Sequence, residues 1–207
     1  MLHSFARHML ELLLVAGVLH TAPVVAQDAG QQASNFSLLS VSGVDVTLDQ
    51  FKGKYVVLEW MNFRCRTVDA LYKNRVLPTM QAELKAQDIV WLSIVSEAQG
   101  KQGQVATEKM QRQIEKRGGN QDAVLLDITG HVGQAYGATV SPYLVVINPE
   151  GAIIYQGAFD NQPPGEEMDD DMPAINYVTD ALEAAQKGEM VPYPVTEAYG
   201  CPIRYDR

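Results

Sequence analysis

Three continuous apolar runs stand out in the hydrophobic pattern of this 207-residue chain, at residues 55–61, 89–95 and 143–147. Short runs that are apolar on both faces are typical of strands buried in the centre of a sheet. Weaker strand patterns, bounded by turn residues, occur at residues 36–38, 44–46, 123–126 and 152–156. The last of these follows a tight turn at residues 148–151 and is expected to be the hairpin partner of the third run.

Helical spacing appears between these strand patterns. It extends from residue 65 to residue 87, and Pro78 lies inside it. Proline lacks an N–H group and clashes with the preceding turn, so this helix should kink or split in two. Further helical patterns are found at residues 48–51, 107–116, 131–136 and 175–186. The alternation predicts an α/β fold with a central mixed sheet, partly parallel and covered by helices on both faces.

Cys65 is placed where the first strong strand gives way to the long helical segment. A thiol at a helix start lies near unpaired backbone N–H groups and the positive end of the helix dipole, and both favour the thiolate. Arg64 and Arg66 flank the cysteine and act in the same direction. The pattern therefore predicts a redox nucleophile.

Glu59 is the charged residue inside the first apolar run. Two interpretations carry equal weight. The side chain either reaches solvent from the end of its strand, or it is a carboxylate near Cys65 that relays protons.

Charge and the N-terminal segment set further bounds. The net charge of −9 argues against nucleic acid as a partner, because a phosphate-binding surface needs an excess of Lys and Arg. Residues 1–26 carry Arg7, a mostly apolar stretch and small residues that end at Ala26, which resembles a cleaved secretory signal peptide. An uncleaved anchor is the alternative, although the apolar stretch is short for a spanning helix.

We therefore expect a signal peptide at residues 1–26, one domain at residues 27–187 and a C-terminal tail at residues 188–207. The mature protein would be periplasmic or extracellular and free of the membrane after cleavage. It contains two cysteines, Cys65 and Cys201. Two are too few to staple a small scaffold, so both raise a question of function.

The order of elements, with a cysteine at the end of the first core strand, resembles the thioredoxin fold. In residues 138–143 (Ala-Thr-Val-Ser-Pro-Tyr), Pro142 stands where thioredoxin-like proteins carry a cis-proline that faces the reactive cysteine. Residues 134–137 and 146–151 are also typical of this superfamily. Residues 58–60, 90–93, 100–103 and 199–201 are similar to an exported bacterial subgroup, described as redoxin or alkyl hydroperoxide reductase/thiol-specific antioxidant (peroxiredoxin-like) domain proteins.

Two positions depart from the patterns of these relatives. Val68 replaces the second cysteine of a Cys-x-x-Cys motif, so a local disulfide cannot form and the usual resolving thiol is missing. Asn62 stands at the threonine position of the peroxiredoxin signature. Its amide could still donate a hydrogen bond to a peroxide.

The resemblance implies three alternative functions. The first is a thiol peroxidase with antioxidant activity, in which the Cys65 thiolate becomes a sulfenic acid, Arg64 or Arg66 stabilises charge, and Cys201 condenses with the acid. An external dithiol would then reduce the resulting disulfide. That crosslink would also restrain the unfolded chain by roughly 5 kcal/mol, so a purely structural bond is an equal alternative.

The second alternative is a thiol–disulfide exchange protein that uses Cys65 on the thiols or disulfides of exported proteins, with Pro142 holding the substrate strand. The third is a non-catalytic binding scaffold. Trp60 is a further candidate contact for substrate, although a tryptophan within a strand run is more often part of the core. We expect no cofactor and no metal, because His131 is the histidine that remains after signal cleavage and zinc ligands are too few.

Overall fold

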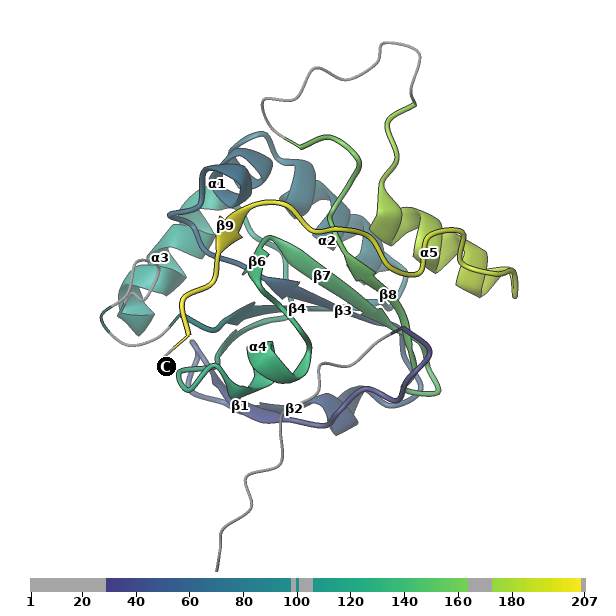
Figure 1. Cartoon of the computed structure of the whole chain (residues 1–207). Helices are drawn as coiled ribbons and strands as arrows, with labels where there is room; N and C mark the ends of the chain where they lie inside the picture. The colour runs from purple at the N-terminus through teal and green to yellow at the C-terminus, as the bar shows by residue number, and fades with distance from the viewer. Residues whose placement is uncertain (1–28, 98–99, 101–105, 164–172, 206–207) are drawn as a thin grey trace, which may run out of the picture.

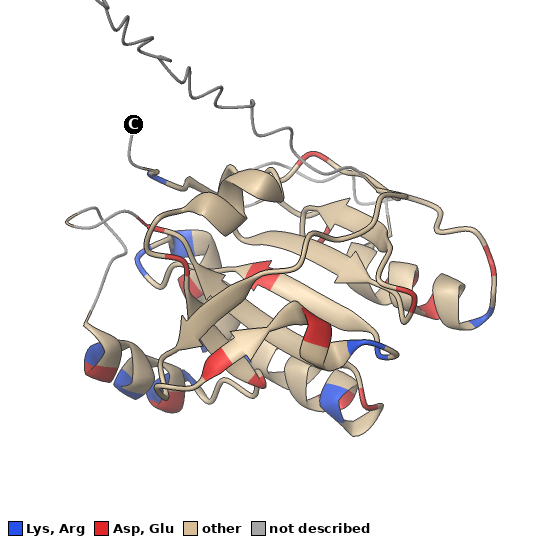
Figure 2. Cartoon of the chain, turned by 90° about the horizontal axis from the view of Figure 1, so that it is seen from below, with Lys and Arg blue, Asp and Glu red and all other residues tan. Residues whose placement is uncertain are grey.

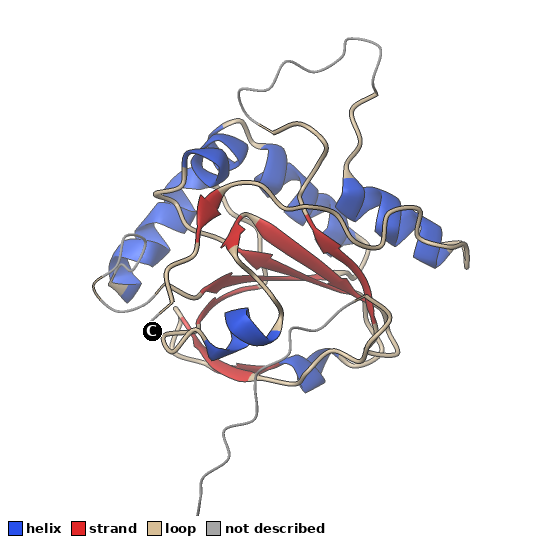
Figure 3. Ribbon diagram, viewed as in Figure 1, coloured by secondary structure: helices blue, strands red, loops and turns tan. Residues whose placement is uncertain are grey.

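The computed structural model describes residues 29–97, 100, 106–163 and 173–205. The expected signal peptide, most of the 100–103 connection and the acidic run 166–171 lie outside these residues. Figure 3 shows the described helices and strands. In chain order they are β1 (Ser37–Ser40), β2 (Asp45–Thr47), the 3-10 turn η1 (Leu48–Phe51), β3 (Val56–Trp60), α1 (Arg66–Lys73), α2 (Val76–Ala86), β4 (Val90–Val95), α3 (Thr107–Arg117), β5 (Ala123–Leu126), α4 (His131–Ala135), β6 (Val140–Ser141), β7 (Tyr143–Ile147), β8 (Ile153–Gly157), α5 (Tyr177–Gln186) and β9 (Cys201–Pro202).

The main sheet has seven strands in the order β2-β1-β5-β4-β3-β7-β8. β3 pairs in parallel with β4, and β4 pairs in parallel with β5. β7 runs antiparallel to β3 and forms the expected hairpin with β8. The predicted α/β fold with a mixed sheet is therefore confirmed, and the strands with continuous apolar runs occupy its centre.

Two hydrophobic clusters cover the two faces of this sheet. Figure 1 shows α1, α2 and α5 on one side and α4 on the other. Val57 of β3 and Met61, which directly follows that strand, face the first group of helices, whereas Leu58 and Trp60 of β3 face α4. This alternation follows from the period of two along a strand, which sends successive side chains to opposite faces. The other side chains of β3 are apolar, and Glu59 is the charged residue of this strand and is completely buried.

The expected long helix at residues 65–87 is split into α1 and α2, as Pro78 predicted. The break lies at Asn74 and Arg75, ahead of the proline, and Arg75 has a left-handed φ of 65°. Pro78 is the third residue of α2, where the N–H that it lacks would have had no partner inside the helix. The proline is thus tolerated because a new helix begins just before it.

The C-terminal tail has a fixed path, which the sequence did not predict. Figure 1 shows it as the yellow segment that crosses the molecule from α5 to β9. The tail first follows the edge of β8, where Gln156 bridges in parallel to Val195. It then forms a small two-stranded sheet with β6, in which Ser141 pairs with Cys201.

Among the described residues, no helix is long and apolar enough to span a bilayer. Basic and acidic residues are interspersed along the surface, for example on α3 (Figure 2).

Candidate redox site

Cys65 and Cys201 form a disulfide bond in this structure, with 5.5 Å between their Cα atoms. Cys65 is the N-cap residue of α1 and follows the end of β3, as its place in the sequence predicted. Its side chain is buried, with 1% exposure, whereas Cys201 is partly exposed. The sequence did not show whether these two cysteines pair. The bond between them is either a redox-active disulfide or a structural crosslink.

Pro142 lies opposite the bonded pair, and the peptide bond between Ser141 and Pro142 is cis. This confirms the cis-proline that the resemblance implied. The Cys65 sulfur is 3.2 Å from the carbonyl oxygen of Ser141. Cys65 is far from Ser141 and Pro142 in the sequence. The pairing of β3 with β7 in the sheet brings the helix start and the cis-proline together.

The tail strand β9 pairs antiparallel with β6 directly beside the cis-proline. Ser141 faces Cys201, and Val140 faces Pro202. One residue further along, the Ile203 N–H donates a 2.9 Å hydrogen bond to the carbonyl of Thr139. The tail thus reaches the cysteine as an extended strand on a sheet edge.

Contacts on both sides of Cys201 hold this tail in place. The Thr196 hydroxyl accepts a 3.0 Å hydrogen bond from the N–H of Ala158, and the Tyr199 hydroxyl donates to the carboxylate of Asp160. After the cysteine, the Tyr205 hydroxyl donates to the Ala138 carbonyl at 2.5 Å. These bonds act in addition to the disulfide in holding the tail along this path.

Asn62 is buried in the loop before Cys65, but its amide nitrogen donates to Glu97 at 2.9 Å. Its side-chain oxygen accepts from the N–H of Arg64 at 2.9 Å, which shapes the loop. Glu97 also accepts a 3.3 Å bond from the N–H of Arg204, so it joins residues 61–64, which we call the active loop, to the tail. Burial raises the pKa of Glu97 above its ordinary value.

Glu97 is a residue that the sequence analysis missed. It follows the carboxyl end of the parallel strand β4, at the edge of a sheet where functional side chains gather, and that position was the available signal.

Arg64 and Arg66 are both exposed beside Cys65. A third arginine, Arg117 of α3, is the one that contacts the active loop: its guanidinium lies 4.4 Å from the ring centre of Phe63. Arg117 also forms an ion pair with Asp69 of α1 at 2.7 Å. Hydrogen bonds from Lys73 and from this arginine lower the pKa of Asp69. Arg117 was not singled out from the sequence, because α3 reads there as an ordinary polar surface helix.

Glu59 is fully buried on the helix-covered face of β3, so the interpretation that it reaches solvent is wrong. One carboxylate oxygen accepts bonds from the Ser93 hydroxyl at 2.7 Å and the Trp91 indole at 2.8 Å. The Tyr72 hydroxyl donates to the same oxygen at 3.0 Å. Burial raises the pKa of Glu59, and these bonds oppose that rise. Tyr72 belongs to α1, so the helix that begins at Cys65 is tied to this carboxylate.

Trp60 has no exposed surface, and its indole N–H donates to the Ser96 hydroxyl at 3.0 Å. Its ring lies against those of Tyr136 and Tyr143. The expectation that Trp60 contacts a substrate is therefore corrected, since the side chain belongs to the core. Val68 is also fully buried, and α1 contains no cysteine that could serve as the resolving thiol.

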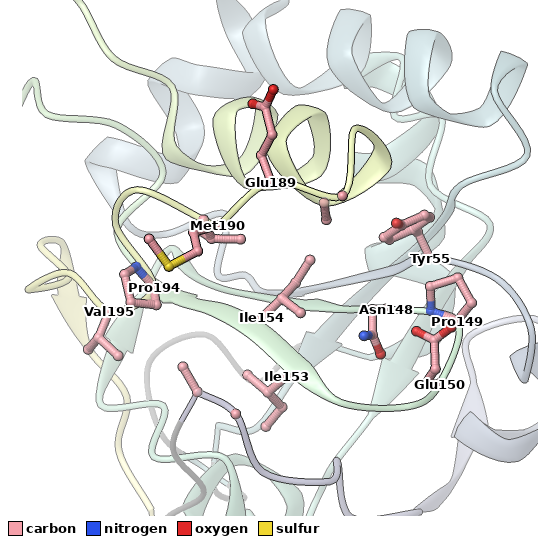
Figure 4. A pocket seen from close by; sticks show the side chains of 15 residues that line it. Tyr55, Asn148, Pro149, Glu150, Ile153, Ile154, Glu189, Met190, Pro194 and Val195 are labelled. Carbon is pink, nitrogen blue, oxygen red and sulfur yellow. The ribbon is translucent and has the colours of Figure 1, made fainter.

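A groove of about 720 Å³ lies elsewhere on the molecule, between the end of α5, the β7–β8 turn and the tail (Figure 4). Tyr55 and Ile154 line it together with Met190, a residue that is 93% exposed. Tyr55 precedes β3, whereas Cys65 follows that strand, so the groove is at the opposite end of the sheet from the disulfide. Among the described residues, no group of His, Cys, Asp and Glu is placed to hold a metal ion.

The mixed sheet, the cysteine at the junction of β3 and α1 and the facing cis-proline define a thioredoxin-like redox protein. A family model described as Redoxin matches residues 28–173, and the chain belongs to that family. A comparison with curated proteins gave no match.

Several solved structures share this fold at low sequence identity. A hypothetical protein from Sinorhizobium meliloti 1021 is 22% identical, with a TM-score of 0.75 over 88% of this chain and 97% of that one. An uncharacterized conserved protein from Geobacillus kaustophilus is 23% identical, with a TM-score of 0.75 over 86% of this chain and 92% of that one. A putative thiol:disulfide interchange protein DsbE from Chlorobium tepidum is 21% identical, with a TM-score of 0.53 over 63% and 85%. Identities this low establish the fold and no more.

Proposed function

We propose that the protein is a thiol–disulfide oxidoreductase whose redox pair is Cys65 and Cys201. The observation that carries this proposal is the place of their bond. It joins the cysteine at a helix start to a strand that runs along the cis-proline edge, where Pro142 was expected to hold a substrate strand. Exchange on a protein disulfide needs an attacking thiol. A strand edge beside that thiol can bind an extended substrate segment through main-chain hydrogen bonds.

Cys65 is the nucleophile in this proposal. In the reduced protein its thiolate attacks one sulfur of a substrate disulfide, a new bond forms to Cys65, and the other substrate sulfur leaves as a thiolate. The Cys201 thiolate then attacks Cys65, which releases the second substrate sulfur and forms the observed disulfide. An external dithiol restores both thiols, so each cycle moves two electrons from that dithiol to the substrate.

The surroundings of the pair fit these roles. The N-terminal end of α1 favours negative charge at Cys65, as attacker and as leaving group. Arg64 and Arg66 are exposed on either side of it, where they add positive potential for the incoming substrate. Cys201 supplies the resolving thiol that Val68 cannot. The reaction belongs outside the cytoplasm, because residues 1–26 resemble a signal peptide and because disulfides persist there.

The test uses the reduced full chain with oxidised glutathione as the disulfide. Mass spectrometry should find the Cys65–Cys201 bond forming while glutathione is released. Cys65→Ser should give no exchange above background. Cys201→Ser should retain glutathione on Cys65, because the resolving thiol is gone. An unchanged rate in Cys65→Ser would refute the proposal.

Peroxidase activity is the second candidate, since the same disulfide is the product of condensation between Cys201 and a sulfenic acid at Cys65. Asn62 gives it little support, because its amide nitrogen is directed at Glu97. Hydrogen peroxide replaces glutathione in the parallel experiment. Faster closure of the disulfide with peroxide than with any disulfide substrate would favour the peroxidase.

A further inference from the structure

We propose that the edge formed by Ser141 and Pro142 is a binding site for an extended peptide in which glycine directly precedes the reacting cysteine, and that the tail occupies this site as an internal copy of the substrate. The inference rests on the proposed exchange activity and names the substrate class. The observation behind it is that the tail pairs with β6 as a strand and so places its own cysteine against Cys65.

Gly200 is the position that the site selects most strongly. It has a φ of +145°, which L side chains rarely adopt. A Cβ atom at this position would overlap the carbonyl oxygen of Ser141 and lie 3.1 Å from Cδ of Pro142. The obstacle is backbone and a proline ring, neither of which can turn away. In any peptide that binds in the same register, a side chain one residue before the cysteine would overlap the same atoms of Ser141 and Pro142.

The other tail positions describe the rest of the site. Pro202, directly after the cysteine, is exposed and sets no limit on the side chain. Ile203 is buried, with 9% exposure, in the hydrophobic cluster that contains Trp60 and Tyr143. Tyr199 lies two residues before the cysteine and hydrogen-bonds Asp160. The site therefore fits an exported protein segment of the form aromatic–Gly–Cys–any–aliphatic.

Substrate and tail must then alternate on one edge. In the reduced protein the incoming substrate strand displaces the tail from β6 and pairs with Ser141, and Cys65 attacks the disulfide of that strand. The tail then returns to β6. Cys201 attacks Cys65 and releases the substrate sulfur, while the tail replaces the substrate strand on the edge. The contacts of Thr196 with Ala158 remain outside this edge and keep Cys201 nearby during the exchange.

Two disulfide-linked peptide dimers test the site on the reduced Cys201→Ser chain: one of Tyr-Gly-Cys-Pro-Ile and one of Tyr-Ala-Cys-Pro-Ile. The rate of mixed-disulfide formation on Cys65 is measured by mass spectrometry and divided by the rate of each peptide with free glutathione. The glycine peptide should react at least about tenfold faster, which corresponds to about 1.4 kcal/mol. Equal normalised rates overturn the inference.

Oxidised glutathione on the same variant separates the two proposals. If it forms a mixed disulfide and neither peptide does, the peptide site is wrong and the exchange activity stands. If neither glutathione nor a peptide reacts with Cys65, the proposed function itself fails.

A second measurement compares two glycine variants of the tail in a chain that keeps both cysteines. Gly200→Ala should slow closure of the Cys65–Cys201 bond by about tenfold, because the tail no longer fits the edge. Gly188→Ala is the matched control: Gly188 also has a positive φ, of 71°, but an added Cβ meets nothing within 4 Å. Equal closure rates in the two variants would overturn the inference.

Discussion

The sulfur of Cys65 is bonded to that of Cys201, although 136 positions separate the two residues in the chain. The bond closes residues 65–201 into one loop between the helix start and the tail, and β1, β2 and β3 lie outside that loop. Because the tail also hydrogen-bonds β6 and β8, the crosslink secures a segment that is already in place. The same pair can therefore serve both the stability of the fold and its redox chemistry.

Removal of the crosslink should destabilise the domain. Cys65→Ser and Cys201→Ser should each lower the free energy of unfolding by up to about 5 kcal/mol, because either change frees the same long loop in the unfolded chain. Urea denaturation under oxidising conditions measures the loss. A reductant should bring the wild-type chain to the level of the variants and leave the variants unchanged. Stabilities that are unaffected by both treatments would contradict a crosslinking role.

Alkylation should distinguish the two thiols of the reduced protein. Cys201 is partly exposed, whereas Cys65 is covered by the tail, so iodoacetamide should modify Cys201 first while the tail remains on β6. Peptide mapping by mass spectrometry gives both rates. Gly200→Ala should speed modification of Cys65 by loosening the tail. Preferential alkylation of Cys65 in the wild-type chain would show that the tail leaves on reduction.

The hydrogen bonds of the tail should tune the redox equilibrium. Thr196→Val removes the hydroxyl that bonds the N–H of Ala158 and the hydroxyl of Tyr155. A buried N–H without a partner costs about 1–3 kcal/mol. Without this contact the tail of the reduced chain is less restrained, so closing the disulfide costs more conformational entropy. The ratio of disulfide to dithiol, measured against a glutathione buffer, should therefore fall by about tenfold. Glu197→Gln, at an exposed neighbouring position, should leave the ratio unchanged.

Glu59 should make stability depend on pH. Burial raises its pKa above the ordinary value of 4.5, so the folded chain binds this proton more tightly than the unfolded chain does. Its favourable contribution to the free energy of unfolding is therefore complete below pH 4.5 and is lost as the pH rises through the folded-state pKa. Glu59→Gln cannot ionise, so its stability should fall less between pH 4.5 and pH 8.

Urea denaturation at the two pH values measures this effect. Glu97, whose pKa burial also raises, contributes a fall of the same sign, and Glu97→Gln separates the two contributions. If Glu59→Gln and the wild-type chain lose equal stability over this interval, Glu59 does not titrate as the structure requires.

Local patterns predicted much of this fold because their causes are local. The apolar runs gave β3, β4 and β7 within a residue or so, and the position of Cys65 between β3 and α1 followed from the same pattern. The split of the long helix was predicted from Pro78, because a proline disrupts only the helical turn that contains it, and this effect is visible in the local sequence. The place of Trp60 in the core was one of two readings, and burial decided between them.

The redox site needed more than local patterns. A two-residue strand such as β9 has no periodicity to detect, and the tail around it is rich in proline and glycine. Glu97 and Arg117 lie in segments whose composition fits an ordinary surface, and they reach the active loop through the packing of β4 and α3 around it. A contact between two distant segments changes the residue pattern of neither segment, so the pattern cannot predict it.

The sequence by itself predicted the class of fold and the position of Cys65 between a strand and a helix, because both depend on hydrophobic periodicity. The cis-proline at Pro142 was implied by the resemblance that a motif of a few residues carries. Only the tertiary structure decided that Cys201 is bonded to Cys65, that the tail lies as a strand on the edge of Ser141, and that Glu59 is buried. These facts depend on which surfaces meet when the sheet closes, and the meeting of distant surfaces is set by packing of the whole chain.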